Sequence, residues 1–118
     1  MFVIRKRQLD TLTQATSEEF LLRMDLHLRA HFEPIVGHLN DLKLREFTSR
    51  NWEISNDYGL TSELGVCSYL EAACILGEDF PVAKPWAKPL LEQECSEADK
   101  LDRLNEQVLA QHFSTVAK

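Results

Sequence analysis

The sequence is poor in residues that break helices and in patterns that mark strands. Only four glycines and four prolines occur among 118 residues, and three of the prolines fall between Pro81 and Pro89. No stretch shows the sustained alternation of apolar and polar residues, with β-branched enrichment, that is typical of strands. These absences argue against a sheet and predict an all-α fold.

Long hydrophobic runs and paired cysteines are also missing. No apolar run approaches the roughly 18 to 20 residues that a membrane-spanning helix needs. The opening MFVIRKRQLD places its charges after a very short apolar patch, the reverse of a signal peptide. Cys67, Cys74 and Cys95 form no close C-x-x-C pair, which fits reduced thiols better than a disulfide framework. We therefore expect a cytoplasmic protein that does not act on a membrane.

Positive charge is absent from the middle of the chain. No Lys or Arg occurs between Asn51 and Ala83, whereas this stretch holds six acidic residues, and the net charge of the whole chain is −6. Nucleic-acid binding relies largely on Lys and Arg side chains that neutralise phosphates. The charge pattern therefore argues against a nucleic-acid partner and against an anionic membrane surface.

The residues that are present have an ordinary globular composition. With 118 residues, 44% of them hydrophobic, the chain has the usual size of one domain, so we predict a single helical domain over residues 1–118. Helical spacing predicts about five helices, over residues 5–31, 41–58, 63–76, 85–91 and 96–116, the first either continuous or broken near Ala15. Segment 63–76 is apolar around most of its circumference, which places it at the centre of a compact bundle.

Several residues mark where these helices begin and end. Pro34 should end the first helix and open a short turn. Gly59 is expected to close the second helix, and Thr61 or Ser62 to cap the third. Ser96 opens the pattern Ser-Glu-Ala-Asp, a capping box in which Asp replaces the usual Glu, at the start of the last helix.

Histidines four residues apart supply the candidate metal ligands. His27 and His31 fall on one helical face, and His38 and Cys95 could complete a site with them. No Glu of the H-E-x-x-H type and no cysteine pair fixes such a geometry. We therefore predict no metal.

Catalysis would need a nucleophile or paired carboxylates in an organised pocket. Neither a Gly-rich phosphate loop nor a nucleophile elbow is present to build an active site around Cys67. Most carboxylates fall at helix caps or on polar faces, where solvation and helix dipoles explain them, as at Glu18, Glu19, Glu97 and Asp102. We predict no enzyme activity, no cofactor and no small-molecule substrate.

The two predicted helices over residues 41–58 and 62–76 have the lengths and the short turn of a helix-turn-helix. A recognition helix needs Arg, Lys, Asn or Gln for base edges and phosphates, whereas the second helix offers Glu63, Glu71 and an apolar surface. Two core helices joined by a tight turn are the better interpretation.

Large aromatic residues in polar surroundings are candidate anchors for a protein partner. Phe80 and Trp86 lie in GEDFPVAKPWAKP, predicted to be mostly loop, where an aromatic ring can equally fold back as a lid on the core. The N-terminal arm Ile4–Arg7 has two possible interpretations, a docking segment and a solvated helix start. The predicted partner-binding residues are Phe80, Trp86, Trp52, Arg5 and Arg7.

Most of the chain resembles a family of small helical bacterial proteins whose genes lie beside spike and effector genes of type VI secretion systems. The resemblance lies in YGLTSELGVCSYLEAACILGEDFP followed by KPWA, in the opening IRKRQLDTL and in RMDLHLRAHF. The matching residues are Ile4, Arg5, Gln8, Tyr58, Gly59, Ser62, Glu63, Val66, Tyr69, Leu70, Gly77, Asp79, Phe80, Pro85, Trp86 and Ala87. Two positions depart from the pattern: Gly65, where a charged residue is more frequent, and Pro81, where an acid is usual.

The resemblance implies a non-enzymatic accessory role, as an adaptor or co-chaperone that helps to load an effector onto the secretion spike. Its partner would then be another protein, namely an effector, a chaperone or a spike component. The main alternative is an immunity protein that neutralises a neighbouring toxin with its acidic central face. A helix-turn-helix nucleic-acid binder is a remote alternative.

Overall fold

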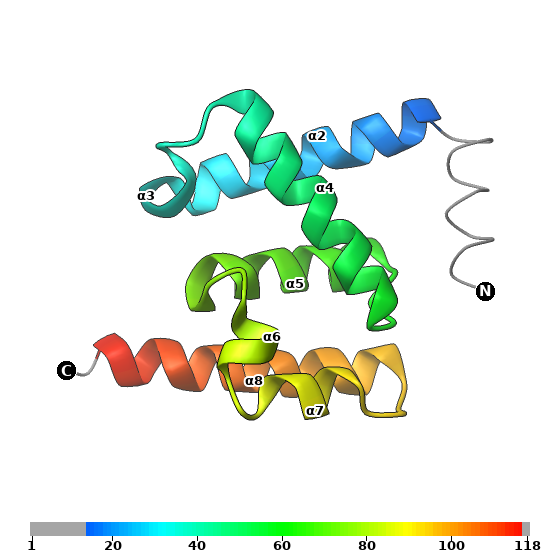
Figure 1. The fold of residues 1–118 in the computed structure, drawn as a ribbon, viewed down its shortest axis with the longest axis vertical. Helices are drawn as coiled ribbons and strands as arrows, with labels where there is room; N and C mark the ends of the chain where they lie inside the picture. Colours follow the sequence, from blue (N-terminus) through cyan, green and yellow to red (C-terminus); the bar gives the residue numbers. More distant parts are fainter. Residues whose placement is uncertain (1–13, 117–118) are drawn as a thin grey trace. The chain divides into compact units, whose positions relative to one another are not determined.

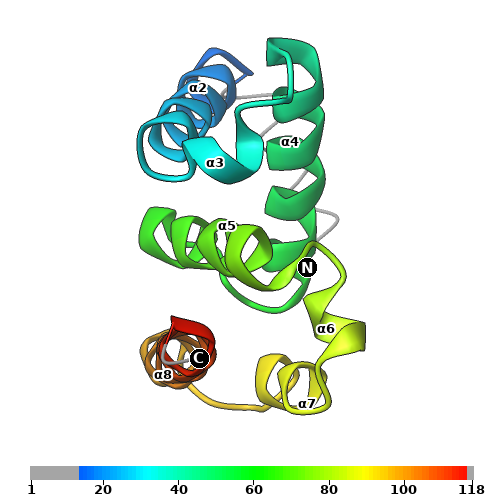
Figure 2. The same cartoon turned by 90° about the vertical axis from the view of Figure 1, so that its left-hand side faces the viewer.

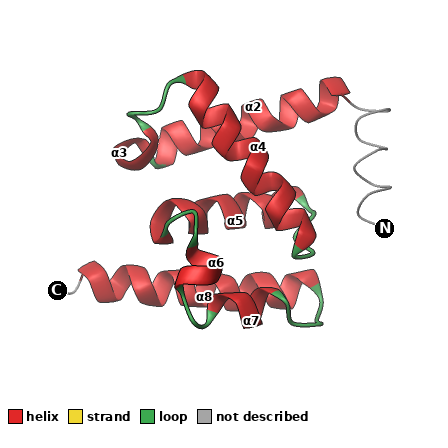
Figure 3. Cartoon of the chain, in the orientation of Figure 1, coloured by secondary structure: helices red, strands yellow, loops and turns green. Residues whose placement is uncertain are grey.

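The computed structural model describes residues 14–116, and this part of the chain contains seven helices and no strand (Figures 1 and 3). The all-α fold class is confirmed. None of the described helices combines the length and the apolarity needed to cross a membrane. The helices are α2 (Gln14–His31), α3 (Glu33–Val36), α4 (Asp41–Asp57), α5 (Glu63–Leu76), α6 (Phe80–Ala83), α7 (Ala87–Leu91) and α8 (Glu97–Val116).

Five of these helices correspond to the five predicted ones, and two short helices are additional. The additional helices, α3 and α6, have four residues each and carry a proline within their first two positions. A proline there has its φ angle already set for a helix and lacks only an N–H that would have no partner. Helix α2 runs without interruption from Gln14 to His31. Residues 5–13 lie outside the described part, so the choice between one helix and two over residues 5–31 stays a prediction.

The chain divides into two compact units, which meet in sequence between Glu53 and Ile54. Among the described residues, the first unit comprises 14–53 and the second 54–116, so the last four residues of α4 belong to the second. A single domain over residues 1–118 stays a prediction.

In the first unit, α3 packs against α2. Arg29 of α2 also bonds to Leu39, in the loop after α3, and to Asp41, the first residue of α4. The core of this unit contains the buried side chains of Met24, Leu28, Val36 and Leu44. The Arg29 guanidinium donates a hydrogen bond to the carbonyl oxygen of Leu39 at 2.8 Å. The side chain of Asn40 caps α4 by accepting a bond from the Lys43 N–H at 2.8 Å.

In the second unit, α5 lies alongside α8, and both run in the same direction (Figures 1 and 2). Helix α6 contacts α5 and α7, and α7 in turn contacts α8. Most of α5 is buried, as its apolar composition predicts. The largest fully buried side chains of this unit include Tyr69, Phe80, Leu70, Leu91 and Leu104.

The helix ends of the second unit follow the predicted signals. Ser62 caps α5, because its Oγ accepts a hydrogen bond from the Gly65 N–H at 2.9 Å. Ser96 does the same for α8 with the Asp99 N–H at 3.1 Å. Gly59 follows α4 with a φ angle of 85°, and Gly77 follows α5 with a φ angle of 105°. Residues with a Cβ atom adopt such positive φ angles only with strain. Helix α7 begins at Ala87 rather than at Pro85.

Candidate protein-binding surfaces

The predicted aromatic anchors differ in their accessibility. Phe80 is completely buried, with its ring centroid 5.2 Å from that of Tyr69. It is therefore a core residue, and its proposed role as a surface contact is corrected: the residues around it form α6 rather than an open loop, and this short helix turns the ring inward. Trp86 is half-buried beside it, at 6.5 Å between ring centroids, and keeps part of its surface accessible.

The remaining predicted anchors belong to other parts of the chain. Trp52 belongs to the first unit, where its half-buried ring lies 5.0 Å from that of Phe20. Arg5 and Arg7 lie outside the described residues. The structure thus brings together Phe80 and Trp86, and only Trp86 of this pair offers a surface to a partner.

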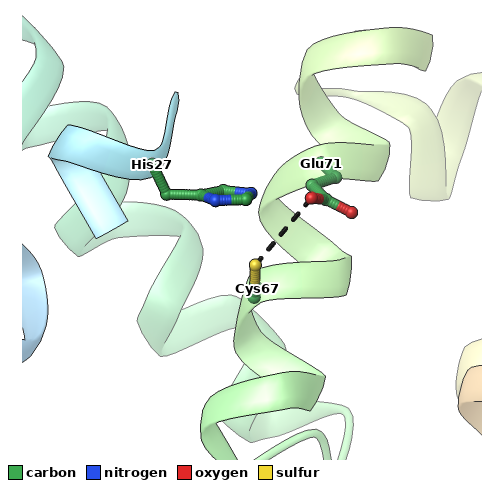
Figure 4. A group of neighbouring side chains, drawn as sticks. All are labelled: His27, Cys67 and Glu71. Atoms are coloured by element: carbon green, nitrogen blue, oxygen red, sulfur yellow. Dashed lines mark hydrogen bonds between the residues drawn. The ribbon is translucent and has the colours of Figure 1, made fainter. Parts of the chain in front are cut away.

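The histidines and cysteines considered for chemistry are placed mainly by their helices. His27 and His31 lie one turn apart on α2, with ring centroids 4.7 Å apart, as their spacing predicts. Cys67 and Glu71 lie one turn apart on α5, and the Cys67 thiol donates a hydrogen bond to the Glu71 carboxylate at 3.9 Å (Figure 4). His27, also drawn in Figure 4, belongs to the first unit and takes no part in this bond.

Both thiols of α5 are held in the protonated form. Burial, followed by the charges of Glu71 and Glu63 and the hydrogen bond to Glu71, raises the pKa of Cys67 to about 11. Burial and the Glu71 charge raise the pKa of Cys74 to about 12. Because the thiolate is the nucleophilic form, Cys67 and Cys74 have little reactivity at neutral pH.

The negative charge of the protein is concentrated in the sequence of the second unit. Residues 1–53 contain eight acidic and eight basic residues, whereas residues 54–118 contain eleven acidic and five basic ones. The first part is thus neutral, and the net charge of −6 belongs entirely to the second. A surface with this charge attracts basic partners and repels anionic ones.

One hollow of the second unit, here called the acidic hollow, has a volume of about 630 Å³. It lies among the end of α4, the end of α7 and the start of α8. Three exposed carboxylates, those of Asp57, Glu92 and Glu94, line it. Its other lining residues are Ile54, Tyr58, Gly59, Leu91, Gln93, Cys95 and Lys100.

The single basic residue of the acidic hollow is engaged inside the protein. Lys100 is only 7% exposed, and its Nζ donates a hydrogen bond to the Tyr58 carbonyl oxygen at 2.6 Å. This places the ammonium at the C-terminal end of α4, where the helix dipole favours a positive charge. Burial and the charges of Glu92 and Asp57 raise the pKa of Tyr58. The accessible charge of the hollow is therefore negative.

A second feature of this unit joins the first turns of α5 and α8. One oxygen of the Glu97 carboxylate accepts hydrogen bonds from the Ser62 N–H, at 3.1 Å, and from the Ser62 hydroxyl. Burial by itself would raise the pKa of Glu97, but hydrogen bonds from Ser62 and Thr61 outweigh it and lower the pKa below its ordinary value. Beside this junction, Leu64 is 68% exposed.

The first unit carries a hollow of about 420 Å³ between α2 and α4, here called the leucine groove. It is lined by Leu22, Asp25, Leu26, Arg29, Asp41, Leu42, Leu44 and Arg45. Leu22, Leu26 and Leu42 are each more than half exposed. Two ion pairs cross it, Arg45 to Asp25 at 2.8 Å and Arg29 to Asp41 at 3.1 Å.

The sequence hypotheses concentrated on aromatic residues and missed these leucines. A signal was present, because Leu21, Leu22, Met24, Leu26 and Leu28 cover more of the circumference of α2 than one buried face requires. Met24 and Leu28 are the buried members, which leaves Leu22 and Leu26 outside the core.

Comparison of the chain with protein-family models, with curated protein sequences and with solved structures gives no match.

Proposed function

We propose that this protein is a non-enzymatic binding module whose second unit docks onto a basic surface of another protein. The observation that carries the proposal is the acidic hollow, where Asp57, Glu92 and Glu94 are exposed while the ammonium of Lys100 is bound internally. Ile54 and Leu91 add apolar lining, so the hollow suits the aliphatic stem of a Lys or Arg side chain as well as its charge. Complementary charge favours rapid and selective association.

The motif resemblance supports a place for this module in a type VI secretion system. We propose an adaptor or co-chaperone that binds an effector, a chaperone or a spike protein in the cytoplasm, without a cofactor, a nucleic acid or a small-molecule substrate. Tyr58 and Gly59, which belong to the matching motif, also line the acidic hollow. The motif and the proposed docking surface therefore share residues.

The test is co-purification of the tagged protein from its native host, followed by affinity measurement with the partner that is found. The double variant Glu92→Lys/Glu94→Lys should weaken binding at least about tenfold and reduce its dependence on salt. Glu18→Lys/Glu19→Lys, which changes the same charge at two exposed residues of α2, is the matched control and should leave the affinity within about twofold.

Two results would contradict the proposal. One is the absence of any secretion-cluster protein among the specific partners, which would remove the type VI setting. The other is an equal loss of affinity in both double variants, which would show that net charge matters and the acidic hollow does not.

The alternative function is that of an immunity protein, favoured by the lack of basic residues from Asn51 to Ala83. An immunity protein and an adaptor both bind a toxic effector, but only the former blocks it. Co-expression in a susceptible cell separates them: an immunity protein restores growth, whereas an adaptor raises the level or the export of the toxin without protection.

A further inference from the structure

The turn between α4 and α5, residues 58–62, is fixed partly by its own backbone. Gly59 supplies the positive φ angle, and the Leu60 N–H donates a hydrogen bond back to the last turn of α4 at 2.9 Å. The Leu60 side chain is completely buried. Two further backbone groups of the turn, the carbonyl oxygen of Tyr58 and the N–H of Ser62, are bound by side chains instead.

Both of these side chains come from the first turn of α8, which lies beside the α4–α5 turn (Figure 1). Lys100 Nζ donates a hydrogen bond to the Tyr58 carbonyl oxygen at 2.6 Å. The Glu97 carboxylate accepts one from the Ser62 N–H at 3.1 Å and another from the Ser62 hydroxyl. Residues three apart lie on the same face of a helix. One face of α8 therefore holds both ends of the turn.

The charges of the two side chains match the helix ends that they contact. Tyr58 follows the C-terminal end of α4, where the helix dipole is negative, and Ser62 is the N-cap of α5, where the dipole is positive. Lys100 is only 7% exposed, and a buried ammonium that loses its acceptor costs more free energy than an exposed one. The contact from Lys100 therefore restrains the turn more strongly than a pair of exposed charges would.

The restrained turn is also part of the acidic hollow. Tyr58 and Gly59 line the hollow together with Asp57, which directly precedes them, while Glu92 and Glu94 line it from the segment after α7. The distance between the Asp57 carboxylate and the other two carboxylates therefore depends on where the turn is held. A cationic side chain is bound best when the carboxylates around it are already in place.

We propose that Glu97 and Lys100 form a two-point clamp, which holds the turn over residues 58–62 and thereby positions Asp57 in the acidic hollow. Lys100 is then a positioning residue for a basic partner, although its own charge repels that partner. The role in binding rests on the proposed function, whereas the clamp itself is a property of the fold.

Hydrogen exchange of the full chain, read by mass spectrometry over residues 55–66, tests the clamp. Lys100→Met keeps most of the aliphatic stem and removes the ammonium, and Glu97→Ala removes the other point of the clamp. Because one turn is held at both points, each variant should speed the exchange of amides at both ends of the turn, by at least about tenfold. Circular dichroism should show that both variants keep their helices.

Binding of a hexa-lysine peptide at about 20 mM NaCl, where surface charges are little screened, tests the positioning role. Electrostatics alone predicts that Lys100→Met binds the peptide more tightly, because a positive charge has been removed. Positioning predicts the opposite, a loss of affinity of at least about threefold. Lys88→Met is the matched control, because Lys88 is exposed and lies four residues before Glu92. It removes the same charge and should bind the peptide at least as tightly as the wild type.

Three results separate the possibilities. Exchange that stays unchanged in both Lys100→Met and Glu97→Ala overturns the clamp. Faster exchange together with an affinity of Lys100→Met equal to or above that of the wild type overturns the positioning role. If Glu92→Lys/Glu94→Lys also binds the peptide like the wild type, the acidic hollow is not a docking surface and the positioning role falls with the proposed function, while the exchange rates still decide whether the clamp exists.

Discussion

Gly65 occupies a position where a side chain would collide with the junction between α5 and α8. A Cβ atom built on it would overlap with the Glu97 carboxylate and come within 3.1 Å of Ser62 Oγ. Glu97 lies close to this glycine because it accepts hydrogen bonds from Ser62. A glycine at position 65 therefore has a physical reason in this chain, because any side chain there would displace the Glu97 carboxylate.

Gly65→Ala should lower the free energy of unfolding by about 1 kcal/mol, because the carboxylate of Glu97 must move away from its donors. In a Glu97→Ala background the same change should be neutral or stabilising by up to about 1 kcal/mol, since alanine is the better helix former. Urea denaturation of the four proteins of this double-mutant cycle measures the coupling. Additive effects of the two substitutions would show that the overlap between the alanine Cβ atom and the Glu97 carboxylate does not change the free energy of unfolding.

The Glu97 junction should also make stability depend on pH. Its pKa is lowered in the folded protein, because the bonds from Ser62 and Thr61 outweigh the effect of burial. A carboxylate with a lowered folded pKa stabilises above its unfolded value, about 4.3, and loses this contribution as pH falls through the folded value. The difference in unfolding free energy between wild type and Glu97→Gln should therefore shrink from pH 6 downward to about pH 3. A constant difference would contradict the pKa direction.

Phe80 and Trp86 should respond to truncation in different ways, although both come from one segment of the sequence. Phe80→Ala should cost about 3 to 5 kcal/mol of folding free energy, because its ring is completely buried. Trp86→Ala should leave a folded protein and, if its accessible face meets the partner, weaken association by about 1 to 3 kcal/mol. Thermal melting checks the first value and titration with the co-purified partner checks the second. An unchanged affinity would remove Trp86 from the interface.

At the scale of helices, the ends of α5 depend on two conformational signals, the Ser62 cap and Gly77. Gly77 has φ of 105° and ψ of 147°, a region that is essentially restricted to glycine. Gly77→Ala should therefore destabilise the protein by about 1 to 3 kcal/mol. Chemical denaturation measures this cost. A variant as stable as the wild type would mean that the chain after α5 can adopt another path.

Long helices were predictable from the sequence, while short ones and the binding surfaces were not. The α5 bounds follow from Ser62, Gly77 and a dense apolar pattern, and the cap of α8 from Ser96, since each signal acts within one turn. Helices α3 and α6 are too short for periodicity to mark them. The acidic hollow joins residues up to 46 positions apart, from Ile54 to Lys100, so spacing could not assemble it.

At the scale of the whole molecule, the sequence pairs a neutral part with one that holds the entire net charge of −6. Repulsion among like charges destabilises a folded state, and salt screens it. Raising NaCl from about 20 to about 200 mM should therefore raise the melting temperature by about 1 to 4 °C. This rise in melting temperature with salt should be smaller for Glu92→Lys/Glu94→Lys than for Glu18→Lys/Glu19→Lys. Equal rises in the two variants would show that the repulsion does not originate in residues 54–118.

The burial of the Lys100 ammonium has a practical consequence for measuring how the acidic hollow binds a partner. Reagents that acylate amines need an accessible nitrogen, and the one of Lys100 is buried and bonded to the backbone of Tyr58. Lys43 and Lys88 are exposed and would be modified first. A fluorophore coupled to the exposed lysines would thus report on binding, while Lys100 in the acidic hollow stays unmodified.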